Sequence, residues 1–242
     1  MPPEIDWRDK DAPIAIQAAD ADEFFLYARR LVARGLVSST LGNIAVRGRH
    51  PQDEKKSIIY TKCRGVSLEE MSRDHLVVTS IETNDLLSGS TPPSIGHQMN
   101  RAIMILRPDV NAVIHTHPDA VIGYFSQSPA DAMKMISVDT ALVLGAPPRI
   151  LPSNVNLETD SSQVAEFVAA TNCLVMPNHG LTTFGRTLSQ AYHRHTAFVA
   201  EAQRLIWAEL LARIRGNPVR FVEDSETAQL YSLGEKVIYG RT

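Results

Sequence analysis

The sequence predicts one mixed α/β domain, and three observations lead to this prediction. Segments with the apolar spacing of amphipathic helices alternate with short runs that are rich in β-branched residues. No stretch is rich enough in Gly, Pro or Ser to separate two domains, and no internal repeat is visible. The 242 residues are 44% hydrophobic and 21% charged, which is typical of a globular protein. We therefore expect residues 1–242 to form a single domain.

The first third of the chain predicts a helix followed by strands. Apolar and small residues recur at three- and four-residue spacings between Ile14 and Val37, as on the buried face of a helix. A polar turn follows at Ser38-Ser39-Thr40. Three segments then predict strands, at 42–46, 57–61 and 75–81.

The rest of the chain alternates helices with buried strands. A helix from Ser94 to Leu106 is stopped by Pro108, because proline cannot continue a helix. The run from Asn111 to His117 predicts a buried strand. Further helices are predicted at 118–125, 160–171 and 188–214, and a short strand at 173–176, while 135–144 and 149–151 are apolar stretches of undecided type.

Charge and hydropathy exclude several classes of function. A net charge of -3 and a pI near 6.2 give no basic surface for nucleic acid. No apolar run approaches the roughly 20 residues that cross a bilayer, and Met1 to Asp11 lacks the apolar core of a secretory signal. We expect a cytoplasmic protein with no nucleic-acid or membrane partner. Cys63 and Cys173, the two cysteines, are accordingly expected to be unpaired.

Three histidines predict a metal site. His115 and His117 are two residues apart on a predicted strand, so their side chains leave the same face. His179 lies in the turn Pro177-Asn178-His179-Gly180 directly after an apolar strand, where loops often present functional groups. Three histidines with an open fourth position form a catalytic ligand set, whereas buried, hydrogen-bonded histidines are the alternative. We predict one divalent ion, with zinc preferred over manganese, iron or cobalt.

Several motifs, in order along nearly the whole chain, resemble the class II aldolase/adducin family. That family includes fuculose-phosphate aldolases, ribulose-phosphate epimerases and several decarboxylases. Thr40-Leu41-Gly42-Asn43 is similar to its early Gly-Asn signature, and Thr61 to Gly65 followed by Glu69-Glu70-Met71 is similar to its second anion-binding loop. The main resemblance lies in Arg107-Pro108-Asp109, Asn111-Ala112-Val113, His115-Thr116-His117 and Asn178-His179-Gly180-Leu181.

The resemblance implies a fold, an assembly and a set of site residues. The fold is a single three-layer αβα domain around a mostly antiparallel sheet. The assembly is a homotetramer with active sites at subunit interfaces. His115, His117 and His179 become the metal ligands, and Thr40 and Asn43 hold the anionic end of a small substrate.

One departure from the family pattern concerns its catalytic carboxylate. The aldolases and epimerases carry an acidic residue eleven positions before the Arg of Arg-Pro-Asp, and in this chain that position is Gly96. His97 is the next residue, but one position on a helix is a rotation of about 100°. His97 is therefore a candidate replacement only if the turn is rearranged, and otherwise it is a polar residue near a helix start.

The missing acid favours decarboxylation over aldol cleavage. Aldol cleavage needs a base for the hydroxyl proton, whereas a departing carboxylate is already an anion. Decarboxylation needs an electron sink, which a metal ion supplies, and a later proton donor. His97 and Tyr231 are the candidate catalytic residues for that proton, although nothing in the spacing prefers Tyr231 to Tyr239.

The second anion-binding loop favours a carboxylate substrate. Arg64 can bind a carboxylate with two parallel hydrogen bonds, and Ser94 is the second candidate contact. Ile95 stands at the position of a phosphate-binding serine of the family, which weakens the case for a phosphate. In the alternative, Lys62 and Arg64 are solvated loop cations.

The sequence thus predicts a metal-dependent carbon–carbon lyase, first as a decarboxylase of a hydroxylated aromatic acid or an oxo or hydroxy acid. Three alternatives stay open. The chain is a class II retro-aldolase, or an epimerase or dehydratase acting on a sugar acid, or a non-catalytic, adducin-like interaction module.

Overall fold

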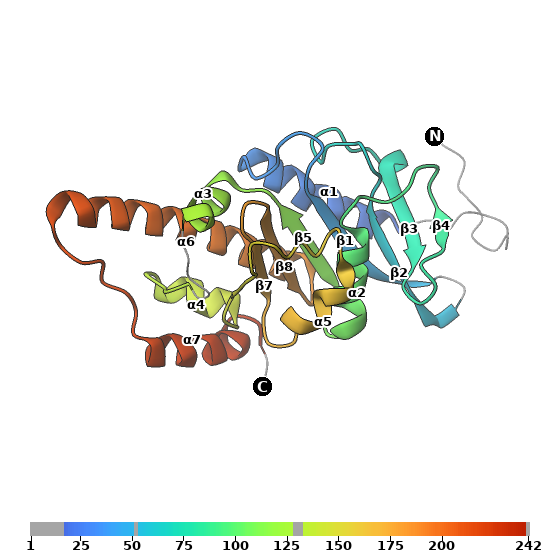
Figure 1. The fold of residues 1–242 in the computed structure, drawn as a ribbon. Helices are drawn as coiled ribbons and strands as arrows, with labels where there is room; N and C mark the ends of the chain where they lie inside the picture. Colours follow the sequence, from blue (N-terminus) through green and yellow to red (C-terminus); the bar gives the residue numbers. More distant parts are fainter. Residues whose placement is uncertain (1–16, 51–52, 128–132, 241–242) are drawn as a thin grey trace.

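The protein is described here by a computed structural model that covers residues 17–50, 53–127 and 133–240. One eight-stranded sheet with the order β4-β3-β2-β1-β5-β8-β7-β6 lies between two layers of helices (Figure 1). Each neighbouring pair of strands is antiparallel except β6 and β7, which are parallel. The expected αβα architecture around a mostly antiparallel sheet is confirmed. The strands are β1 (Asn43–His50), β2 (Asp53–Lys62), β3 (Leu76–Ser80), β4 (Leu86–Ser88), β5 (Ala112–Thr116), β6 (Arg149–Ile150), β7 (Cys173–Met176) and β8 (Gly180–Gly185).

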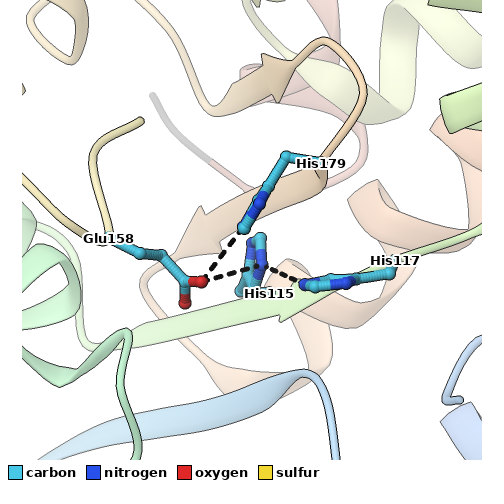
Figure 2. A group of neighbouring side chains, drawn as sticks. All are labelled: His115, His117, Glu158 and His179. Carbon is cyan, nitrogen blue, oxygen red and sulfur yellow. Dashed lines mark hydrogen bonds and ion pairs between the residues drawn. The ribbon is translucent and has the colours of Figure 1, made fainter. Parts of the chain in front are cut away.

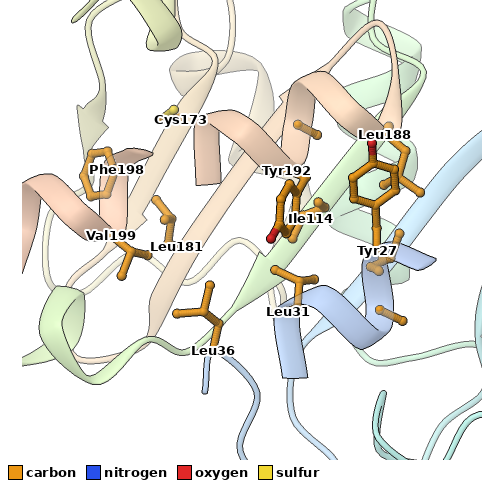
Figure 3. Close-up of a cluster of buried hydrophobic side chains, with 14 of the residues drawn as sticks. Tyr27, Leu31, Leu36, Ile114, Cys173, Leu181, Leu188, Tyr192, Phe198 and Val199 are labelled. Carbon is orange, nitrogen blue, oxygen red and sulfur yellow. The ribbon is translucent and has the colours of Figure 1, made fainter. Parts of the chain in front are cut away.

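The helices divide between the two faces of the sheet. One core contains side chains of α1, α3, α4 and α6, and Figure 3 shows part of it between α1, β5, β8 and α6. The other core lies under α2 and α5. The helices are α1 (Ala18–Ala33), α2 (His97–Leu106), α3 (Asp119–Gln127), α4 (Val138–Leu144), α5 (Val164–Phe167), α6 (Leu188–Arg215) and α7 (Asp224–Val237), with 3-10 turns at Arg73–His75 and Ser161–Gln163.

Strand β5 shows how the alternation of side chains places the polar groups. Ile114 belongs to the core under α1 and α6, and Val113 belongs to the core under α2 and α5. Because successive side chains of a strand point to opposite faces, His115 lies on the α2 side of the sheet. Thr116 lies on the other side, where its Oγ1 is 2.7 Å from Nε2 of His195 on α6.

Most predicted elements are present, with some differences. The predicted strand 173–176 and the helix beginning at Leu188 are confirmed. The helix predicted for 160–171 is instead the 3-10 turn Ser161–Gln163, capped by Asp160, followed by the single helical turn of α5. Residues 14–16 of the first predicted helix lie outside the described residues.

Three strands and two helices of the described residues were not predicted as such. They are β4, β8, α7, and the helix α4 and strand β6 within the undecided apolar stretches 135–144 and 149–151. Strand β8 begins inside the Asn178-His179-Gly180 turn motif, where the local pattern indicates only a loop. Cys63 and Cys173 are buried and unpaired, as expected. No helix within the described ranges is long and apolar enough to cross a membrane.

Candidate metal centre

The first two histidines stand at the end of the central strand β5. His115 is fully buried, between Asn43 of β1 and Thr182 of β8, its partners in the two neighbouring strands. His117 follows the last residue of the strand and is half-buried. Both side chains therefore emerge on the α2 side of the sheet, at the edge where β5 ends.

The third histidine lies in the tight turn between β7 and β8. Asn178 has a φ of 60°, a left-handed conformation that asparagine tolerates better than most residues. The backbone N–H of His179 donates to the carbonyl of Met176 at 3.0 Å and closes the turn. The turn thus directs the His179 ring toward the end of β5.

Gly180 allows this turn to approach β5 closely. A Cβ atom at residue 180 would lie 2.5 Å from the carbonyl oxygen of Thr116, and 3.1 Å and 3.3 Å from the rings of His117 and His115. Since a backbone oxygen cannot move aside as a flexible side chain can, only glycine fits at this position. The glycine of the Asn-His-Gly motif is therefore part of the centre.

The three rings converge on one point (Figure 2). The Nε2 atoms of His115 and His117 are 2.9 Å apart, and the ring centroids of the three histidines lie 4.8 Å to 5.2 Å from one another. His115 Nδ1 lies 2.8 Å from Thr182 Oγ1, which can accept its proton and leave Nε2 bare toward the cluster.

Glu158 is the member of the centre that the sequence analysis missed. Its Oε2 is 3.0 Å from Nε2 of His179 and 3.7 Å from Nε2 of His115. One candidate ligand atom from each of the four residues lies within 4.8 Å of the others. Glu158 belongs to an irregular loop between β6 and the 3-10 turn at Ser161, where no periodicity marks a functional position.

Two asparagines fix the other oxygen of this carboxylate. Asn43 Nδ2 donates to Glu158 Oε1 at 3.3 Å, and Asn100 Nδ2 donates to Asn43 Oδ1 at 2.6 Å. Asn156 Oδ1 accepts a hydrogen bond from the backbone N–H of Glu158 at 3.0 Å, which shapes the loop locally. The carboxylate therefore bridges the histidines and the Asn43 side chain.

The electrostatics give the side chains the protonation states of metal ligands. Burial lowers the pKa of His115 to about 3, and burial followed by repulsion from His179 lowers the pKa of His117. Burial alone would raise the pKa of Glu158, but attraction to His115 and a hydrogen bond with His179 outweigh it and lower this pKa to about 2. At neutral pH the centre has an ionised carboxylate beside neutral imidazoles at positions 115 and 117.

This donor set fits a divalent cation. Two imidazole nitrogens that face each other at 2.9 Å repel through their lone pairs unless a proton or a cation lies between them. Neutral imidazole and ionised carboxylate are the forms that bind zinc and its neighbours, so a shared cation would satisfy all four groups at once.

A protein-family model matches most of the chain. The model of the "Class II Aldolase and Adducin N-terminal domain" matches residues 22–206, which include all four residues of the centre. The chain belongs to the class II aldolase/adducin family.

Individual relatives include an aldolase and an adducin by name. The chain is 22% identical to an L-fuculose phosphate aldolase from Methanococcus maripaludis, over 72% of this chain and 88% of that protein. It is 30% identical to human gamma-adducin over 54% of this chain, but this covers only 19% of gamma-adducin. Among solved structures, the protein YgbL from Escherichia coli superposes with a TM-score of 0.73 at 19% identity, over 88% of this chain and 98% of YgbL.

Three of the predicted substrate-binding residues, Thr40, Arg64 and Ser94, lie on connected loops, and Asn43 is the first residue of β1. Lys62 Nζ donates to the carbonyl oxygens of Thr40 and Val66 at 2.7 Å and 2.6 Å. The backbone N–H of Ser94 donates to the carbonyl of Lys62 at 3.0 Å, and that of Arg64 donates to the carbonyl of Pro92 at 2.9 Å. Lys62 is thus a buried structural cation and not a solvated one.

The four predicted substrate-binding side chains differ in exposure and in hydrogen-bond partners. Thr40 and Arg64 are exposed, and Asn43 is 3% exposed and contacts Glu158. Ser94 Oγ is buried and has no hydrogen-bond partner among the described residues.

The two predicted catalytic residues, His97 and Tyr231, do not belong to the group of convergent ligand residues. His97 Nε2 lies 3.2 Å from both Thr79 Oγ1 on β3 and Asn84 Oδ1. Strand β3 is three strand positions from β5, about 14 Å at the usual spacing of about 4.8 Å. The rotation between residues 96 and 97 therefore directs His97 away from the centre, and the side chain found beside the histidines is Glu158. Tyr231 lies in the hydrophobic core on α7, which packs against α4.

Proposed function

We propose that the protein is a divalent-metal-dependent carbon–carbon lyase that cleaves a hydroxy-carbonyl compound in the retro-aldol direction. One observation carries this proposal: an ionised carboxylate and three histidines meet at one centre. The aldolase among the relatives, matched over most of its length, supports the same class of reaction.

The chain's own groups divide the work. His115, His117 and His179 would hold the metal ion. When bound, the ion would act as a Lewis acid toward a carbonyl or hydroxyl oxygen of the substrate. Glu158 would accept the hydroxyl proton, a contribution of about 10²- to 10⁴-fold for positioned acid–base catalysis. Asn43 would hold the carboxylate in place through Oε1.

Decarboxylation is the second candidate. We favoured it from the sequence because residue 96 carries no carboxylate, and Glu158 removes that reason. Its remaining support is the anion-binding loop. Arg64 is exposed there, the Ser94 hydroxyl has no partner among the described residues, and Ile95 stands at the position of a phosphate-binding serine of the family. A hydroxylated aromatic acid or an oxo or hydroxy acid would suit these groups.

The remaining alternatives have less support. An epimerase or dehydratase of a sugar acid would use the same carboxylate for proton transfer, but the group of convergent residues contains no second carboxylate. A non-catalytic, adducin-like module would have no need for four convergent ligand groups. The short match to gamma-adducin adds little to that reading.

Zinc and a homotetramer are the finer parts of the proposal. Histidine and carboxylate ligands suit zinc, and manganese, iron and cobalt are the alternatives. Large apolar side chains on the C-terminal half of α6 support assembly, because a monomer rarely exposes so many together. They include Trp207, Leu210, Leu211 and Ile214.

Metal analysis of the purified protein tests the centre. We expect about one divalent ion per chain in the wild type, and loss of that ion in His179→Ala. His193→Ala removes an exposed histidine on α6 and is the matched control. Full metal content in His179→Ala would contradict the centre.

Product analysis tests the reaction. Candidate hydroxy-carbonyl compounds and hydroxy or oxo acids are incubated with the metal-loaded protein, and aldehyde and carbon dioxide are both measured. An aldehyde fragment supports retro-aldol cleavage, whereas carbon dioxide alone moves decarboxylation to first place. For an acid substrate, Arg64→Ala should raise KM, while Arg215→Ala, at the end of α6, should not.

A further inference from the structure

The space beside residue 96 is occupied by the carboxylate of Glu158. A Cβ atom at Gly96 would lie 2.0 Å from Glu158 Oε1 and 3.1 Å from Glu158 Cδ. It would also lie 2.7 Å from Nδ2 of Asn43, the donor to that same oxygen. No side chain at position 96 can coexist with the carboxylate where it now lies.

The backbone at residue 96 does not explain the glycine. Gly96 is the N-cap of α2, with a φ of -72° and a ψ of 4°, which other amino acids adopt without strain. Gly96 is also buried, and because glycine has no side chain it supplies no capping hydrogen bond to the first turn of α2. What the position requires is therefore room, and the group that uses the room is Glu158.

We propose that Glu158 is the fourth ligand of the metal centre when no substrate is bound, and that Gly96 is the residue that admits it. This inference rests on the proposed metal centre and deepens it. The loop between β6 and the 3-10 turn at Ser161 delivers the carboxylate across the N-terminus of α2. Oε2 faces His179 and His115, while Oε1 is held by Asn43.

Asn43 and Asn100 are the positioning residues of this ligand. Both side chains are buried, at 3% and 0% exposure. Asn100 donates to Asn43 Oδ1, which orients the Asn43 amide so that its Nδ2 faces Glu158. A side chain at residue 96 would push on both partners of the Asn43–Glu158 hydrogen bond and release the carboxylate from the centre.

The test is a double-mutant cycle on Zn²⁺ affinity, measured by competition with a chromophoric chelator. Glu158→Gln should weaken Zn²⁺ binding by at least about 100-fold, more than the 10- to 100-fold usual for outer-shell partners. Gly96→Ala should weaken it by a similar factor, although residue 96 contributes no ligand. The double variant should be no weaker than either single variant, because both changes remove the same ligand.

Three controls separate this mechanism from a general loss of structure. Glu166→Gln changes an exposed acid on α5, and Gly123→Ala adds a methyl group where no atom lies within 4 Å. Neither should alter Zn²⁺ affinity. The exchange variant Gly96→Glu/Glu158→Gly returns a carboxylate to the same space and should recover part of the lost affinity.

The outcomes distinguish this inference from the proposed reaction. Unchanged Zn²⁺ affinity in Gly96→Ala or Glu158→Gln would overturn the inference, whether or not the enzyme cleaves a substrate. Fully additive losses in the double variant would also overturn it, since the two residues would then act separately. Tight, Glu158-dependent Zn²⁺ binding without product from any tested substrate would instead count against the lyase proposal alone.

Discussion

Thr182 Oγ1 lies 2.8 Å from Nδ1 of His115, its cross-strand partner in the β5–β8 register. The contact fixes both the orientation of the imidazole and the nitrogen that faces the centre. The next residue, Thr183, points to the opposite face of the sheet, where its hydroxyl donates to the carbonyl of Ala191. Adjacent threonines on β8 thus contact groups on opposite faces of the sheet, His115 on one face and helix α6 on the other.

Thr182→Val should therefore weaken metal binding. The valine keeps the shape of the side chain but cannot accept the Nδ1 proton of His115. We expect a loss of about 10- to 100-fold in Zn²⁺ affinity, as for other outer-shell partners of a ligating histidine. Thr183→Val is the matched control and should destabilise the fold without changing that affinity. Equal affinities in Thr182→Val and the wild type would show that the contact has no influence on the ligand.

Gly180→Ala should damage both stability and metal binding. The added Cβ would overlap the carbonyl oxygen of Thr116 and press on two ligand rings. We expect a loss of about 1 to 3 kcal/mol in the free energy of unfolding, as for other overpacked sites, together with lower metal content. Urea denaturation and metal analysis provide the two measurements. Gly123→Ala on α3 should be neutral or slightly stabilising, and a similar loss there would remove the steric explanation.

Lys62→Met should loosen the anion-binding loops. Lys62 is 2% exposed, and its ammonium group joins the loop of Thr40 to the loop of Val66. Methionine keeps the length but leaves both carbonyl oxygens without this donor, which we expect to cost about 2 kcal/mol. Thermal unfolding and limited proteolysis of the two loops test this. The exposed Lys56 provides the control variant Lys56→Met, and an equally small effect at both positions would refute the structural role of Lys62.

His97 should make folding stability depend on pH below about 6.5. Burial lowers the pKa of His97 in the folded protein to about 4, from an ordinary value of 6.5. As the pH falls, the unfolded chain binds a proton at this residue before the folded protein does. The contribution of His97 to the free energy of unfolding is complete above pH 6.5 and is lost progressively toward pH 4. Between pH 7.5 and pH 5 the loss from this residue is about 2 kcal/mol.

Urea denaturation of the wild type and His97→Gln at these two pH values measures that contribution. Other buried histidines, including His195, titrate in both proteins, so only the difference between their pH dependences reports on His97. The variant should lose about 2 kcal/mol less than the wild type when the pH is lowered. Identical losses would mean that His97 does not remain neutral in the fold. His193→Gln, at an exposed position, should behave as the wild type does.

Local sequence patterns were sufficient to predict the histidine part of the centre. Side chains two residues apart on a strand share a face. The strand predicted for residues 111–117 therefore requires His115 and His117 to point to the same side. The turn motif at 177–180 similarly marked His179 as a presented side chain. These are local rules, and short segments are sufficient to apply them.

The carboxylate that joins the histidines could be identified only from the three-dimensional fold. Glu158 stands 41 residues after His117 in a loop without periodicity, so no local pattern distinguishes it from the other acidic residues. Its position depends on the register that places Asn43 beside His115 and on the approach of its loop to the N-terminus of α2. In the sequence, the only sign of this arrangement is that residue 96 is a glycine. The glycine can be explained only when the group beside it is known, and that group, Glu158, comes from a distant part of the chain.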